Sequence, residues 1–245
     1  MTAQRIYITG ASSGIGTALA RAVAGPDVTL GLVARRMERL EALRDELRPQ
    51  GARVHVYQAD VRDRERMAEV GRQFAEEADG ISLAIANAGL SLNDKLLEGD
   101  PTRMNEVVSI NVLGVLNTLT PLVPTMVRQG AGHMVTIGSV AGFRGMPGKA
   151  GYSGSKAAVK TIMDSWRVQL KPHGVRVTTI CPGFIETELT GQNAYRMPFI
   201  MSAEKAARLT LRAVQRGRKT YVFPWQMRLV VPLLQRAPDW MLPSM

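Results

Sequence analysis

The segment from Thr9 to Gly16, with sequence T-G-A-S-S-G-I-G, constrains the fold more than any other part of the chain. It follows a short apolar run, residues 5–9, and precedes an alanine-rich stretch that extends to Ala24. Glycines allow a sharp turn and a close approach to a ligand, and a helix start presents free N–H groups to an anion. A strand, a glycine-rich turn and a helix in this order therefore predict a dinucleotide-binding α/β unit.

Strand and helix patterns alternate along the rest of the chain. Further strands are expected at residues 28–33, 54–59, 81–86, 133–139 and 175–180. Helices are expected at residues 37–47, from near 63 to 78, at about 101–128 and from 152 to about 171. This alternation is typical of a doubly wound parallel sheet flanked by helices. With 245 residues, 45% of them hydrophobic, and no linker or repeat, the chain is expected to form one α/β domain over residues 1–245.

Cysteine and histidine usage argues against a disulfide or a metal site. The single cysteine, Cys181, cannot form an intrachain disulfide, which suits a reducing compartment. The three histidines, His55, His133 and His173, show no ligand spacing and are expected to be structural or surface residues. The first residues lack the apolar segment of a secretory signal, and no apolar run is expected to reach the roughly 18–20 residues of a membrane span. A cytoplasmic location is therefore expected.

The charge balance suggests an anionic partner. The chain carries 31 Lys and Arg against 21 Asp and Glu, a formal net charge of +10. The basic residues are spread along most of the chain, few aromatics lie among them, and no nucleic-acid motif is present. Anionic cofactors, substrates or lipid headgroups are therefore favoured over nucleic acid.

Tyr152 and Lys156 are candidates for proton-transfer chemistry. Residues four apart on a helix share a face, about 5–6 Å apart at Cβ, so the phenol and the ammonium can share one site. A nearby cation favours the phenolate over the phenol, which normally titrates near 10. Such a pair often arises by chance, but here a buried strand ends at Ser139, and the Gly/Pro-rich loop 142–151 can bring that serine beside Tyr152.

This set of residues, together with the T-G-x-x-x-G-x-G turn, resembles the short-chain dehydrogenase/reductase family over about residues 5–190. The resemblance implies a seven-stranded parallel sheet of order 3-2-1-4-5-6-7 and a homodimer or homotetramer built from helix pairs. It also implies that Tyr152 exchanges a proton with the substrate oxygen, Ser139 polarises that oxygen, and Lys156 binds the nicotinamide ribose and lowers the pKa of the tyrosine. Asn111 would be the fourth catalytic residue, holding a water that joins the lysine to solvent.

The expected dinucleotide contacts follow the ends of successive strands. In the first turn they are Gly10, Ser12, Ser13, Gly14, Ile15 and Gly16. After the third strand, the resemblance places Asp60 and Val61 in the adenine pocket, although Asp60 can equally cap the helix that begins near residue 63. After the fourth strand, Asn87, Ala88 and Gly89 match the family's N-A-G turn beside the adenine ribose; the usual preceding Asn is Ala86 here.

The remaining expected contacts surround the nicotinamide. Pro182, Gly183, Ile185 and Thr187 match the family's P-G-x-x-x-T turn. The resemblance implies that the backbone at Ile185 and the hydroxyl of Thr187 receive the carboxamide. Tyr152 and Lys156 complete this set.

The end of the second strand favours NADP over NAD. An NAD enzyme usually has an acidic residue there to hold the ribose 2′-hydroxyl, but this chain has Ala34, followed by Arg35 and Arg36. A guanidinium is a permanent cation that suits a 2′-phosphate. Both arginines could instead begin the solvated face of the next helix, an interpretation that fits Arg36 better than Arg35.

The last quarter of the chain is expected to carry specificity and contacts. Residues 188–216 would form a substrate lid and the helix that follows it, with Tyr195, Met197 and Phe199 covering an apolar, lipid-like or steroid-like substrate. The apolar tail, residues 221–245, is interrupted by prolines and is expected to form short helical pieces. It would pack across a subunit interface or the substrate pocket, or else attach peripherally to a membrane, aided by a basic stripe at Lys205, Arg208, Arg212 and Arg216.

The resulting hypothesis is an NADP-dependent oxidoreductase that interconverts a ketone or aldehyde and an alcohol by hydride transfer. The alternative is a non-catalytic NADP-binding sensor or scaffold, because a dinucleotide fold alone does not imply turnover. The intact set of Asn111, Ser139, Tyr152 and Lys156 argues against that alternative.

Overall fold

The computed structural model describes residues 4–188, 190–191 and 197–238. The strands are β1 Gln4–Thr9, β2 Val28–Ala34, β3 Arg53–Gln58, β4 Leu83–Ala86, β5 Gly132–Ile137, β6 Val175–Pro182, β7 Ile185–Glu186, β8 Met201–Ser202 and β9 Thr220–Phe223. The α-helices are α1 Gly14–Val23, α2 Met37–Leu47, α3 Arg64–Glu77, α4 Thr102–Val108, α5 Gly114–Leu119, α6 Val123–Gln129, α7 Ala150–Leu170, α8 Ala203–Gln215 and α9 Trp225–Arg236.

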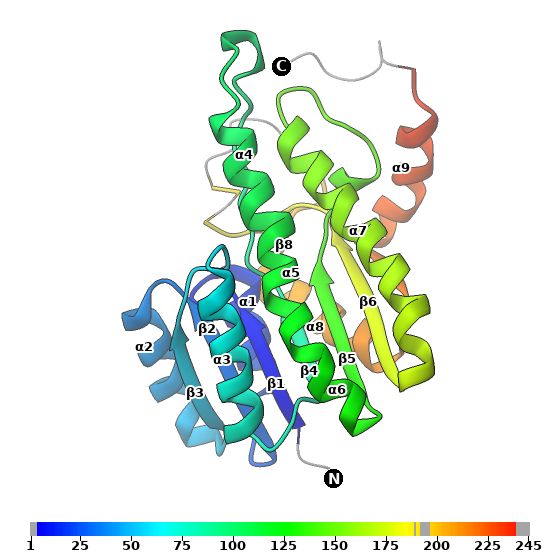
Figure 1. The fold of residues 1–245 in the computed structure, drawn as a ribbon. Helices are drawn as coiled ribbons and strands as arrows, with labels where there is room; N and C mark the ends of the chain where they lie inside the picture. The colour runs from blue at the N-terminus through cyan, green and yellow to red at the C-terminus, as the bar shows by residue number, and fades with distance from the viewer. Residues whose placement is uncertain (1–3, 189, 192–196, 239–245) are drawn as a thin grey trace.

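Seven of these strands form one parallel sheet with the order β3-β2-β1-β4-β5-β6-β9 (Figure 1). The predicted order is confirmed, with β9 as the seventh strand. That strand begins the tail, where Tyr221 lies opposite Ile180 of β6, so the prediction of helical pieces from residue 221 onward was wrong at this point. The sequence Thr-Tyr-Val-Phe is β-branched and aromatic throughout, which favours a strand. A separate pair, β7 and β8, is also parallel.

Helices cover both faces of the sheet, as the alternating side chains of β1 illustrate. Ile6 and Ile8 point into one core with α1, α2 and α8, whereas Tyr7 points into the other with α3, α5 and α7. Successive strand residues face opposite sides, so a parallel sheet buried on both faces requires apolar residues at nearly every position. In Figure 1 the helices α3, α5 and α7 lie in front of the strands.

The predicted helix at 101–128 forms as several consecutive helical segments. A π-helical segment, Ser109–Leu113, separates α4 from α5, and a 3-10 turn, Thr120–Leu122, separates α5 from α6. The whole run, Thr102–Gln129, is long and apolar enough to cross a membrane, with a mean hydropathy of 1.5 over its best window. The expectation that no run reaches this length was therefore wrong. Core helices of globular proteins pass the same test, and this run packs against α3 and α7.

Candidate active site

A cleft of about 560 Å³ lies where the carboxyl ends of the central strands meet. The predicted site residues that line it are Gly10, Ser12, Ser13, Gly14, Ile15, Arg35, Arg36, Asp60, Val61, Asn87, Ala88, Gly89, Ser139, Tyr152, Lys156, Pro182, Gly183, Ile185 and Thr187. Gly16 and Asn111 are not among the residues that line it. The fold therefore brings residues from the ends of six strands, β1 to β6, and the start of α7 to one concave surface, the usual ligand position in an open α/β sheet.

The glycine-rich turn explains why Gly16 is needed without lining the cleft. Gly10 has a φ of 66°, the left-handed region that favours glycine. At Gly16, a Cβ would overlap the carbonyl oxygen of Gly10 and the side-chain amide of Asn87. That amide donates to the carbonyl oxygens of Thr9, at 3.0 Å, and Gly10, at 3.2 Å. Gly16 is therefore a packing residue that lets α1 start directly beneath the turn.

The start of α1 suits an anionic group. Ser13 is the N-cap by position, yet its side chain makes no capping hydrogen bond. None of the residues in the first turn of α1 is acidic. The first N–H groups of a helix lack intrahelical partners and carry a partial positive charge, so this end of the cleft fits the pyrophosphate of a dinucleotide.

The two arginines after β2 are placed differently. Arg35 is 68% exposed at its side chain, and its Nη1 lies 4.0 Å from Oδ2 of Asp60. Arg36 is 37% exposed; its Nε and Nη2 donate to Oγ of Ser12 at 3.3 Å, and its Nη1 donates to Oε2 of Glu188 at 3.0 Å. The sequence favoured Arg35 over Arg36 for the phosphate contact. Both arginines line the cleft, but Arg36 donates to Ser12 in the glycine turn, whereas Arg35 lies near Asp60.

Asp60 lines the cleft and is held by Arg62. It accepts from the backbone N–H of Arg62 at 2.9 Å and from its guanidinium Nη2 at 2.7 Å, and these hydrogen bonds lower the pKa of the carboxyl. Helix α3 is instead capped by Asp63, which accepts from the N–H of Arg66 at 2.9 Å. The alternative that Asp60 caps this helix was therefore wrong.

Lys156 and Tyr152 lie one turn apart on α7 and face the cleft. The Nζ of Lys156 lies 5.8 Å from the centre of the Tyr152 ring and donates to the carbonyl oxygen of Ile137 at 2.8 Å. Burial lowers the pKa of Lys156 to about 8. The loop between β5 and α7 runs close to this helix, because a Cβ at Gly142 would lie 2.8 Å from the carbonyl carbon of Lys156.

Ser139 lies two residues after the end of β5 and lines the same cleft as Tyr152. Its Oγ accepts from the N–H of Ala141 at 3.1 Å. That bond uses an oxygen lone pair and leaves the hydroxyl proton for a ligand. A hydroxyl donor and a phenol that line one cleft are both groups that can donate a hydrogen bond to a carbonyl oxygen.

Asn111 is fully buried in the π-helical segment and organises the wall behind the lysine. Its Oδ1 accepts from the N–H of Leu90 at 2.8 Å, and its Nδ2 donates to the carbonyl oxygen of Leu90 at 2.9 Å and to Oγ of Ser155 at 3.0 Å. A Cβ at Gly89 would lie 3.3 Å from Oδ1 of Asn111 and 3.6 Å from Nζ of Lys156. Gly89 therefore lies between the two side chains and lets them approach. The role of Asn111 in holding a water stays a prediction.

Sequence reasoning missed a buried lysine near the substrate end. Lys149, at the N-cap of α7, is buried and donates from Nζ to Oγ of Ser91 at 3.2 Å; burial lowers the pKa of this lysine. Asp94 accepts hydrogen bonds from the N–H groups of Ala150 and Gly151 and so caps the helix. A lysine in a Gly/Pro-rich loop is ordinarily solvated, so the sequence held no signal for its burial.

Part of the proposed lid lies outside the described residues, including Tyr195. Phe199 is half-exposed. Helix α8, which follows, packs its small residues Ala206 and Ala207 into the core with α1, and its Lys205, Arg208, Arg212 and Arg216 lie on the exposed side.

Known proteins match this chain over nearly its whole length. The family model for short chain dehydrogenases matches residues 4–197. The chain belongs to the short-chain dehydrogenase family. An uncharacterised oxidoreductase from Myxococcus xanthus is 39% identical over 241 residues, 98% of this chain and 94% of that protein.

Solved structures of this family include cofactor complexes. A short-chain dehydrogenase/reductase from Burkholderia phymatum in complex with NAD superposes with a TM-score of 0.87 at 25% identity, covering 97% of each chain. An alcohol dehydrogenase from the archaeon Thermococcus sibiricus, complexed with 5-hydroxy-NADP, has a TM-score of 0.81 at 26% identity, covering 96% of this chain and 99% of that one. This short-chain dehydrogenase is therefore an oxidoreductase with the fold of enzymes that bind nicotinamide cofactors.

Proposed function

We propose that this short-chain dehydrogenase interconverts a ketone or aldehyde and an alcohol, using NADP in preference to NAD. The observation that carries the proposal is that Ser139, Tyr152 and Lys156 line one cleft together with the two arginines after β2. The nicotinamide supplies or accepts the hydride when the cofactor is bound. The protein's own residues must hold the substrate oxygen and transfer one proton to or from it.

The protein's part in reduction is to hold the carbonyl oxygen and protonate it. The hydroxyl of Ser139 donates a hydrogen bond to that oxygen and withdraws electron density from the carbonyl carbon. The phenol of Tyr152 donates its proton as negative charge develops on the substrate oxygen, and in oxidation the phenolate oxygen of Tyr152 takes the hydroxyl proton of the alcohol. The ammonium of Lys156 favours the phenolate because it places a positive charge beneath the ring, 5.8 Å from its centre.

The cofactor preference rests on the guanidinium groups at the end of β2. Arg36 lies beside Ser12 of the glycine turn, and Ala34 offers no carboxylate that would repel a 2′-phosphate. Gly10, Asn87 and the start of α1 line the same cleft as Arg36 and Lys156. These residues fit the charge and length of a phosphorylated dinucleotide.

The substrate end favours an apolar substrate. Leu90, Leu92 and Ile137 line the cleft near Ser139, and residues 188–216 would act as the lid and the helix following it. Apolar walls bind a lipid-like or steroid-like group through the surface that they remove from water. We assign the whole of residues 1–245 to one NAD(P)-binding oxidoreductase domain in the cytoplasm.

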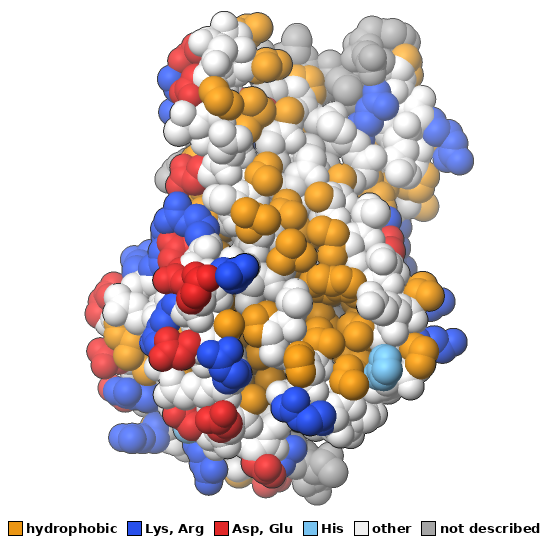
Figure 2. Space-filling model, viewed as in Figure 1, with side chains coloured by type: hydrophobic (Ala, Val, Ile, Leu, Met, Phe, Trp, Pro, Cys, Tyr) orange, Lys and Arg blue, Asp and Glu red, His pale blue; other side chains and the backbone are white. Residues whose placement is uncertain are grey.

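Exposed apolar faces suggest a homodimer or homotetramer. Hydrophobic side chains run over the helices from α4 to α7 in Figure 2, and Val108, Leu113 and Val168 are exposed large apolar residues on these helices. On α9, Trp225, Leu229 and Leu233 recur every four residues and are 64%, 63% and 71% exposed. Stripes of this kind most often mark contact surfaces. We favour a subunit contact for the tail and keep peripheral membrane attachment as the alternative.

A carbonyl panel tests the proposed function. The purified chain is offered ketones and aldehydes of increasing apolar size, each with NADPH or NADH, and cofactor oxidation is followed together with the alcohol formed. We expect NADPH-dependent reduction that improves with apolar size. Tight NADPH binding with no turnover of any panel member would favour a sensor or scaffold instead.

A further inference from the structure

One carboxylate lies between two guanidinium groups at the rim of the cleft. Oε2 of Glu188 accepts from Nη1 of Arg36 at 3.0 Å, and its Oε1 accepts from Nη1 of Arg39 in the first turn of α2. Arg36 also donates to Oγ of Ser12 in the glycine turn. Glu188 follows β7, so the contact joins segments about 150 residues apart in the chain.

This carboxylate occupies a place suited to a phosphate group. Ser12, Arg36 and Glu188 all line the cleft, and Ala34, the last residue of β2, carries no carboxylate. A phosphate monoester carries about two negative charges and three acceptor oxygens, so it can accept from the same two guanidiniums. A carboxylate accepts from each of them with one oxygen, as Glu188 does here.

The contact is strong enough to form and weak enough to be displaced. Glu188, Arg36 and Arg39 all remain partly exposed to solvent. The hydrogen bonds from Arg39 and Arg36 lower the pKa of Glu188, so its carboxyl is ionised at neutral pH. Exposed ion pairs contribute little to stability, which permits exchange with a competing anion.

We propose that Glu188 is a specificity-determining residue whose carboxylate competes with the cofactor 2′-phosphate for the guanidiniums of Arg36 and Arg39. The proposal rests on the NADP preference argued above. NADPH must displace Glu188 from these two groups, whereas NADH has no phosphate to place there. Glu188 therefore weakens NADPH binding selectively and narrows the preference between the two cofactors. Arg39, which no sequence motif indicated, becomes a second phosphate ligand.

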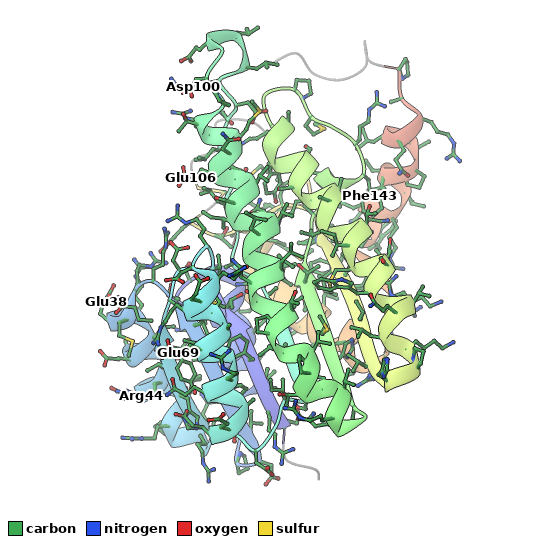
Figure 3. The ribbon with its side chains drawn as sticks, in the orientation of Figure 1. Glu38, Arg44, Glu69, Asp100, Glu106 and Phe143 are labelled. Carbon is green, nitrogen blue, oxygen red and sulfur yellow. The ribbon has the colours of Figure 1, made fainter. Side chains whose placement is uncertain are left out.

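Glu188→Gln and Glu38→Gln make a matched pair of variants. Each removes one negative charge, Glu38 from the first turn of α2 and Glu188 from the segment after β7 that contacts this turn, and glutamine keeps the size of the side chain. Glu38 lies in the first turn of α2, is exposed and points outward at the edge of the molecule in Figure 3. Glu188 instead contacts Arg36 and Arg39. A general change of surface potential therefore affects both variants, and release of the guanidiniums affects only Glu188→Gln.

The experiment measures binding of adenosine 2′,5′-bisphosphate and of 5′-AMP to the full chain by calorimetry. Glu188→Gln is expected to bind the bisphosphate about threefold to tenfold more tightly than wild type, the range that two exposed ion pairs allow. Its affinity for 5′-AMP should stay within about twofold, and Glu38→Gln should stay near wild type for both ligands. Adding Arg36→Gln to Glu188→Gln should remove the gain.

The outcomes separate this inference from the cofactor assignment. Unchanged bisphosphate affinity in Glu188→Gln, an equal gain for 5′-AMP, or an equal gain in Glu38→Gln would overturn the role of Glu188 while leaving the NADP preference intact. If neither wild type nor Glu188→Gln prefers the bisphosphate over 5′-AMP, the cofactor assignment fails and this inference fails with it. If only Glu188→Gln shows the preference, competition by Glu188 is supported, and the NADP preference proposed for the wild type is wrong.

Discussion

Nζ of Lys156 donates a hydrogen bond to the carbonyl oxygen of Ile137 at 2.8 Å while it lies 5.8 Å from the ring centre of Tyr152. The last residue of β5 therefore fixes the ammonium beneath the phenol. The same placement buries the charge, which is the reason that the pKa of Lys156 falls from 10.5 to about 8. The positive charge of Lys156 favours the phenolate of Tyr152, but burying that charge lowers the stability of the folded chain.

The pH dependence of stability in wild type and in Lys156→Met tests whether burial destabilises the charged lysine. Below pH 8 the lysine is protonated in both folded and unfolded chains, and the cost of burying its charge is fully present. Between pH 8 and 10.5 the folded chain releases the proton first, so the wild type gains stability as pH rises, by on the order of 3 kcal/mol. Urea unfolding at pH 7.5 and pH 10 without cofactor should show the free energy of unfolding of wild type rising relative to that of Lys156→Met. If the difference in free energy of unfolding between wild type and Lys156→Met is the same at both pH values, or if wild type loses stability relative to the variant at pH 10, the burial argument is wrong.

Arg36→Ala and Arg35→Ala distinguish the two arginines after β2. Arg36 contacts Ser12 in the cleft, whereas Arg35 is largely exposed, so Arg36→Ala should weaken NADPH binding by about tenfold to a hundredfold, the range of a charge-assisted hydrogen bond. Arg35→Ala should cost less, and NADH binding should change little in either variant. Fluorescence titration with both cofactors measures this. Equal losses for NADPH and NADH in Arg36→Ala would remove the phosphate assignment.

Gly16→Ala should destabilise the chain by about 1–3 kcal/mol, because its Cβ would overlap the carbonyl oxygen of Gly10 and force the turn away from α1. Gly154→Ala is the control. It lies inside α7, nothing lies within 4 Å of its would-be Cβ, and alanine there should stabilise the helix by about 0.5–1 kcal/mol. Urea unfolding should show a lower free energy of unfolding for Gly16→Ala than for wild type, and a higher one for Gly154→Ala. A neutral Gly16→Ala would show that the turn relaxes freely.

The double variant Leu229→Gln, Leu233→Gln tests the apolar face of α9. A chain cut after Lys219 is a poor probe, because it removes β9 from the sheet. The double variant leaves the sheet intact and should lower the molar mass in solution, measured by light scattering, with cofactor binding unchanged. Leu97→Gln, at a leucine elsewhere that is even more exposed, is the control. An unchanged mass, together with wild-type chain that sediments with anionic liposomes, would favour membrane attachment.

Local patterns predicted most of the fold. Helix α2 was expected at residues 37–47 and is observed as Met37–Leu47, because its apolar residues recur with helical spacing between clear turn signals. Strand β9 was missed because it is only four residues long and opens a segment dominated by prolines. A short apolar run of this kind does not distinguish strand from helix by its pattern alone.

Contacts between distant segments were the least predictable part of the site. The Gly-rich turn and the Tyr152–Lys156 spacing are local, so the sequence located them. The bond between Arg36 and Glu188 joins residues 152 apart in the chain, and its partners are ordinary charged residues with no motif. The burial of Lys149 beside Ser91 likewise depends on how two loops pack. Much of the lining of the cleft could thus be predicted, but the long-range contacts of Glu188 and Lys149 could not.

The central claim is that Tyr152 transfers the proton, and Tyr152→Phe tests it most directly. The variant keeps the ring and removes the hydroxyl, so the cofactor site should stay intact. For whichever carbonyl compound the panel identifies, turnover with saturating NADPH should fall by about 10²-fold or more, while the dissociation constant of NADPH stays within a few-fold of wild type. If Tyr152→Phe reduces that compound at the wild-type rate, the proposed mechanism is wrong.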